Sequence, residues 1–111
     1  MAFKIKQDDL EPPLVVVIED PDGIADFNDV VSWRAIGNLN DSLKIDEVPE
    51  IAVDGTNHSK VTVTYRWRLG DTDTVGDMSM EFEALWPGTP PRPQTFPPDD
   101  YETVSILPQL G

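Results

Sequence analysis

The sequence has no cysteine and only one histidine among its 111 residues. The lack of cysteine excludes a disulfide framework, a thiolate zinc site and a cysteine nucleophile. Basic residues are also scarce, since eight Lys and Arg stand against 21 Asp and Glu and give a formal net charge of −13. We therefore expect no nucleic-acid binding, which depends on many basic contacts to phosphates, and no docking on anionic membranes.

Long apolar runs are missing as well. The longest one covers residues 14–18, far below a membrane span, and residues 1–13 contain no apolar stretch of the kind found in a secretory signal. Hydrophobic residues nevertheless make up 39% of the chain and aromatic residues 8%, so a packed core is expected. The length suits a single domain spanning residues 1–111.

The strongest local pattern is alternation of apolar and polar residues. Residues 61–68 alternate without a break, and residues 77–86 place a second apolar row opposite serine and glutamate. A period of two is typical of a half-buried antiparallel strand. Gly and Asp between the two segments, at 69–76, predict a turn, so we expect 61–68 and 77–86 to be neighbouring strands.

Further short strands are predicted along the chain. Residues 14–18 read as a central strand ending at a Pro-Asp-Gly turn, and Phe3 and Ile5 suggest an edge strand protected by lysines. Other segments are 30–36, 43–45, 51–53 and 101–107. About six to eight such strands predict an all-β, immunoglobulin-like antiparallel β-sandwich. The side chains expected inside are Val15, Val17, Val31, Trp33, Val63, Tyr65, Trp67, Phe82 and Ala84.

Proline is concentrated in one place, with six of the 11 prolines between residues 86 and 98. Because proline removes ladder donors and prefers extended geometry, residues 87–98 are predicted to form a stiff loop between the last two strands. We expect this loop, with the tail at 108–111, to contact a partner. The alternative is a loop packed on its own sandwich, with its phenylalanine covering the core. The candidate contact residues are Trp86, Pro90, Arg92, Phe96 and Leu110.

The acidic residues do not follow a metal-binding pattern. Counting from Asp20, an EF-hand loop needs Gly at position six and Glu at position twelve, whereas Gly23 is fourth and Val31 is twelfth. We therefore expect aspartates that cap turns, no metal and no cofactor. His58 is predicted on the surface, and the sequence has no nucleophile elbow or phosphate-binding loop. No enzyme is expected, although so many carboxylates always leave a glycosidase-type pair open.

The second half of the chain carries a recognisable series of motifs. An aromatic strand ends at Trp67 and is followed by Gly-Asp-Thr at 70–72, Gly76 and Glu-Phe-Glu at 81–83. Thr-Phe-Pro at 95–97 then leads into a closing segment at 101–104. Over residues 65–104 this series resembles the immunoglobulin-like N-terminal domain of the baseplate upper protein family of tailed bacteriophages. The chain departs from the family at 86–93, where a short Asp-Gly hairpin is usual, and around 77–78, where an aromatic residue is usual.

The resemblance implies a non-enzymatic structural protein of a phage virion, placed on the tail, baseplate or neck. It also implies contacts with other virion proteins, several copies per particle, and synthesis and assembly in the cytoplasm of the host bacterium. A capsid decoration protein of the same fold is an alternative. A free carbohydrate-binding module is another, but it needs an exposed row of aromatic side chains, and the alternation places these side chains inside.

Overall fold

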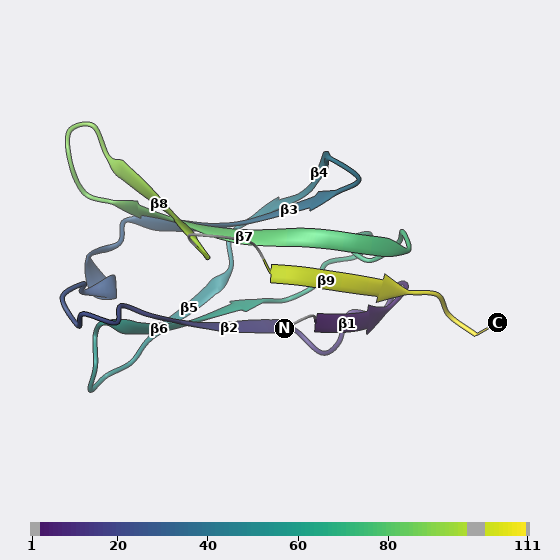
Figure 1. The fold of residues 1–111 in the computed structure, drawn as a ribbon, viewed down its shortest axis with the longest axis horizontal. Coiled ribbons are helices and arrows are strands. Elements are labelled where there is room, and N and C mark those ends of the chain that lie inside the picture. Colours follow the sequence, from purple (N-terminus) through teal and green to yellow (C-terminus); the bar gives the residue numbers. More distant parts are fainter. Residues whose placement is uncertain (1–2, 98–101, 111) are drawn as a thin grey trace.

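The computed structural model describes residues 3–97 and 102–110, and these residues fold as an all-β domain (Figure 1). One short 3-10 helix, η1 (Phe27–Asp29), interrupts the strands. In chain order the described strands are β1 (Phe3–Lys6), β2 (Leu14–Glu19), β3 (Ser32–Leu39), β4 (Ser42–Glu47), β5 (Glu50–Val53), β6 (Lys60–Tyr65), β7 (Gly76–Trp86), β8 (Arg92–Phe96) and β9 (Glu102–Leu107).

The strands form two sheets that face each other. The larger sheet has the order β1-β9-β7-β3-β4, with β8 also paired to β7, and the smaller has the order β2-β6-β5. In immunoglobulin terms β2, β6 and β5 take the places of strands B, E and D, while β9, β7, β3 and β4 take those of G, F, C and C′. The predicted immunoglobulin-like β-sandwich is therefore confirmed, with nine strands in the described residues rather than six to eight.

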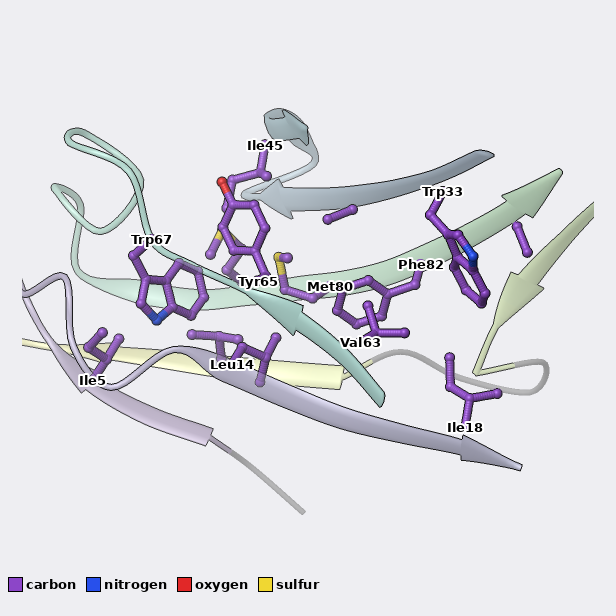
Figure 2. Packing of buried hydrophobic residues seen from close by; sticks show 14 of the residues in the cluster. Ile5, Leu14, Ile18, Trp33, Ile45, Val63, Tyr65, Trp67, Met80 and Phe82 are labelled. Atoms are coloured by element: carbon purple, nitrogen blue, oxygen red, sulfur yellow. The ribbon is translucent and has the colours of Figure 1, made fainter. Parts of the chain in front are cut away.

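The core lies between the sheets and is built from the alternating segments (Figure 2). Val63 and Tyr65 from β6 face Met80 and Phe82 from β7, and all four are at most 1% exposed. Successive side chains of a strand point to opposite faces, so the unbroken alternation predicted correctly which side chains of β6 and β7 face the core. Of the predicted interior residues, those confirmed as buried are Trp33, Val63, Tyr65, Trp67, Phe82 and Ala84.

Three predicted interior residues are exposed instead: Val15 at 52%, Val17 at 55% and Val31 at 65%. In β2 the inward side chains are those of the alternate residues, such as Leu14 and Ile18. The run of β-branched residues contains no polar residue that could indicate which alternate set faces inward, so the prediction chose the wrong one. Val31 precedes β3, directly after the residue that caps η1, where strand alternation does not yet apply.

Two predictions about strand pairing are also wrong. The segments at 61–68 and 77–86 are not neighbours, because β6 belongs to the small sheet and β7 to the large one. The connection at 66–75 crosses from one sheet to the other instead of forming a hairpin. Likewise β2 is an edge strand of its sheet, and β6 is the central one.

The proline-rich segment is only partly a loop. Residues 92–96 form β8, which pairs with β7 over Phe82–Trp86, while β9 pairs with the preceding part of β7. Since β3 occupies the other side of β7, β8 and β9 follow one another along the same side. Pro93 is tolerated because β8 pairs with a single strand and needs no second ladder donor. Of the predicted segments, residues 98, 101 and 111 lie outside the described part of the chain.

Candidate functional site

The β7–β8 hairpin extends past the other strands at one end of the sandwich (Figure 1, upper left). Trp86 and Arg92 are paired across the hairpin, so its loop consists of residues 87–91. All residues of this loop are exposed. Gly88 is required here, because a Cβ at this position would lie 2.9 Å from the carbonyl oxygen of Pro90. The result is a tight, proline-rich loop presented to solvent.

Trp86 and Phe96 pack at the base of this hairpin, against the sandwich. Their rings lie 5.7 Å and 6.0 Å from the ring of Phe27, which is buried. The indole N–H of Trp86 also donates a hydrogen bond of 2.9 Å to the side-chain oxygen of Gln94. Both aromatic residues are half-buried. They therefore hold the hairpin on the sandwich, and Phe96 covers the end of the core as the alternative interpretation expected.

The remaining predicted contact residues divide between the two ends of the molecule. Pro90 and Arg92 are exposed on the hairpin. Leu110 is 96% exposed but follows β9 at the other end of the sandwich, near the C-terminus marked in Figure 1. The neighbouring Gln109 donates hydrogen bonds to Gln7 and Asp9. The structure thus does not bring the C-terminal tail together with the proline-rich loop.

A second loop, residues 20–31 between β2 and β3, lies beside the hairpin. Its shape is set by Asp20, whose carboxylate accepts hydrogen bonds from the backbone N–H groups of Asp22, Ile24 and Ala25. These bonds stabilise the charged form and lower the pKa of Asp20, with the bond from Ala25 contributing most. Asp20 is therefore a loop cap, as predicted. The loop leaves Ile24 84% exposed.

Between these two loops the surface is hollowed. A groove of about 420 Å³, which we call the β2 groove, runs between β2 and β8. Its apolar floor includes Ile18, Phe27 and Phe96, and its acidic lining residues are Glu19, Asp20 and Glu102. Sequence reasoning missed this groove, because β2 was expected in the middle of a sheet. The sequence carried no signal for it, because the uncharged run at 14–18 is equally typical of a central strand.

The opposite end of the sandwich, formed by residues 7–13 and 66–75, is held by internal hydrogen bonds. The Tyr65 hydroxyl donates to Asp71 over 2.6 Å, and the backbone N–H of Arg68 donates to the same carboxylate over 2.8 Å. Burial, together with the hydrogen bond to Asp71, raises the pKa of Tyr65. The buried Thr72 donates to the carbonyl of Asp9. The expectation that aspartates cap turns is therefore confirmed at Asp71.

The titratable side chains show no metal-like grouping within residues 3–97 and 102–110, where no three or more His, Asp or Glu come together to hold an ion. His58 is half-exposed, with its Nδ1 3.8 Å from an oxygen of Asp26. The described aromatic side chains are all buried or half-buried, so they provide no exposed aromatic row. What the hairpin end presents is exposed loop surface and a groove.

No protein-family model matches the chain, and no curated protein or solved structure matches it either. In the part of the chain that the structure describes, no helix is long and apolar enough to cross a membrane.

Proposed function

We propose that this protein is a non-enzymatic structural protein of a tailed-phage virion, and that it docks on a neighbouring virion protein through the loop at 87–91. The phage assignment is supported by the motif resemblance over residues 65–104. The docking role is supported by one observation above all: the proline-rich hairpin extends past the other strands, and every residue of its loop is exposed.

A loop of this kind is suited to binding for a physical reason. Prolines at 87, 90 and 91 restrict the backbone before binding, so little conformational entropy is lost when the loop docks. Below the loop, Trp86 packs on the buried Phe27 and fixes the base of the hairpin. The contact surface is therefore both exposed and preorganised.

The position in the particle is proposed as the tail, baseplate or neck, with capsid decoration as the alternative. Both positions need a rigid sandwich present in many copies. Copy number per particle separates them: a few to a few dozen for tail or neck sites, hundreds for a decoration protein.

The direct test shortens the loop without disturbing its strands. Replacing residues 87–91 by Asn-Gly joins Trp86 to Arg92 through a two-residue turn, a connection that suits hairpins. We expect the variant to fold but to be missing from purified particles when it is the only copy supplied to the phage that encodes it. The measurement is protein quantification in those particles.

The matched control places the same turn at the other end of the molecule. Asn40 and Asp41 connect β3 and β4 with φ of 53° and 62°, so Asp41→Gly creates an Asn-Gly turn where the backbone already suits one. This variant should be incorporated at the normal copy number. Normal incorporation of the 87–91 variant would move docking elsewhere, and absence of the wild-type protein from particles would refute the virion role.

A further inference from the structure

The outer side of β2 has backbone groups that face away from β6. Among the described residues β2 pairs with β6 alone, in antiparallel register. The backbone N–H of Asp20 donates to the carbonyl of Ser59 over 2.9 Å, which continues this register by one pair. Since hydrogen-bonded pairs alternate along an antiparallel ladder, the N–H and C=O groups of Val15, Val17 and Glu19 point to the free side.

Unlike β2, the other exposed edges in the described residues carry features that oppose strand addition. β1 has Lys4 and Lys6, β4 has Lys44 near its middle, and β8 contains Pro93. β5 is only four residues long and begins with Glu50. Charge, proline and shortness are the usual protections of a sheet edge. β2 has six residues and none of these features before its last one.

The β2 groove lies along this unprotected edge. Its floor at Ile18, Phe27 and Phe96 can receive apolar side chains from an extended segment laid against β2. At the far end of β2 the groove is lined by Glu19 and Asp20, and its described lining includes no Lys, Arg or His. Complementarity therefore favours an occupant with alternating apolar residues and a basic residue near its end.

We propose that β2 accepts an extended segment of a partner protein as an additional strand, with its apolar side chains in the β2 groove and a Lys or Arg beside Glu19. Hydrogen bonds from the free backbone groups supply affinity, and the groove supplies specificity. A second copy of this chain is a poorer occupant, because each copy carries a formal net charge of −13. This surface is separate from the proposed hairpin contact, since residues 87–91 do not line the groove.

The first test uses a synthetic peptide of seven residues, alternating Val and Thr with Lys at both ends and blocked termini. Added at about 1 mM to the ¹⁵N-labelled protein, it should slow hydrogen exchange at the amides of Val15, Val17 and Glu19. The same peptide with Glu at both ends should bind at least about tenfold more weakly. Unchanged exchange at these three amides, or equal binding of the acidic peptide, would overturn the proposal.

The second test compares Val17→Pro with Val17→Thr. Proline removes an N–H that faces the free side, so the ladder to β6 stays intact, and threonine keeps that N–H. We expect Val17→Thr to bind like the wild type and Val17→Pro to bind at least about tenfold more weakly. A peptide N-methylated at alternate amides should also fail to bind, and this arm does not depend on how the proline variant folds.

The remaining outcomes are equally decisive. Binding of the N-methylated peptide, or wild-type affinity in a folded Val17→Pro protein, would contradict strand addition. A wild-type dimer that Val17→Pro dissociates would make a second copy the occupant and overturn the partner segment. The variant shortened at 87–91 should still bind the peptide, so that loss of particle docking and loss of strand addition are observed separately.

Discussion

At the end of the sandwich formed by residues 7–13 and 66–75, side chains donate hydrogen bonds to other residues of the domain. At the β7–β8 end the loop is instead exposed to solvent. Trp67 donates its indole N–H to the carbonyl of Pro12, and Thr72 donates to that of Asp9, so the first end is tied together across the chain. At the second end, residues 87–91 are exposed and only the base of the hairpin packs on the core.

The difference between the two ends indicates where a partner can bind without breaking hydrogen bonds within the domain. A partner that contacts the first end competes with hydrogen bonds that the domain already uses, and an unpartnered buried polar group is expensive. A partner that contacts the hairpin loop meets groups that are already hydrated and displaces no internal contact. The three substitutions below test whether the two ends differ in this way.

The largest effect is expected for Trp67→Ala. Trp67 is 5% exposed and packs edge-on against Tyr65 with ring centroids 5.3 Å apart. Its removal should lower the free energy of unfolding by about 3–5 kcal/mol. Urea unfolding measures this loss, with Trp86→Ala as the matched change at the hairpin end. Trp86 is half-buried, so its loss should cost clearly less, and an equal cost would abolish the distinction.

Tyr65→Phe should have an intermediate effect. It deletes the hydroxyl that donates to Asp71 and should cost about 1–2 kcal/mol in urea unfolding. Because the pKa of Tyr65 is raised above the ordinary value of 10.0, the unfolded chain loses this proton first. Wild-type stability should therefore decline as the pH rises above 10, and the decline should be shallower in Tyr65→Phe. Identical slopes would contradict the buried hydrogen bond.

The smallest effect is expected for Asp20→Ala at the hairpin end. The substitution removes a carboxylate that accepts three backbone N–H bonds, and should lower Tm by a few degrees at pH 7. Since the folded pKa of Asp20 lies below 3.8, its contribution is present above that pH and disappears as the pH falls below it. Thermal unfolding at several pH values checks this, with Asp22→Ala as the control that leaves the three bonds in place.

The sequence alone predicted which side chains face the core wherever the alternation was complete. The alternation at 61–68 and 77–86 predicted two inward rows, and the side chains of Val63, Tyr65, Phe82 and Ala84 are buried as expected. Alternation identifies a face of a strand, but it does not identify the neighbouring strand. The crossing between β6 and β7 therefore could not be predicted, because a Gly- and Asp-rich segment of this length suits both a hairpin and a crossing between sheets.

The candidate site was predictable only in part. The exposed loop was predicted from its prolines, although with the bounds 87–98, and Trp86 was predicted from its position at the end of an alternating row. β8 was missed because Pro91 and Pro93 argue against a strand, although an edge strand accepts proline. The free side of β2 could not be read from sequence at all, since being an edge is a property of the whole sheet order and not of residues 14–19.

The pairing of β1 with β9 has a consequence for when the domain can finish folding. Ile5 lies beside Ile106 in a parallel ladder, and the Lys6 ammonium donates to the carbonyl of Pro108, 102 residues along the chain. Contacts of such sequence separation close only after nearly the whole segment has been synthesised, and domains rich in them fold slowly. Until β9 has been synthesised, the edges of β1 and β7 that pair with it have no partner strand, and unpaired strand edges of this kind favour aggregation.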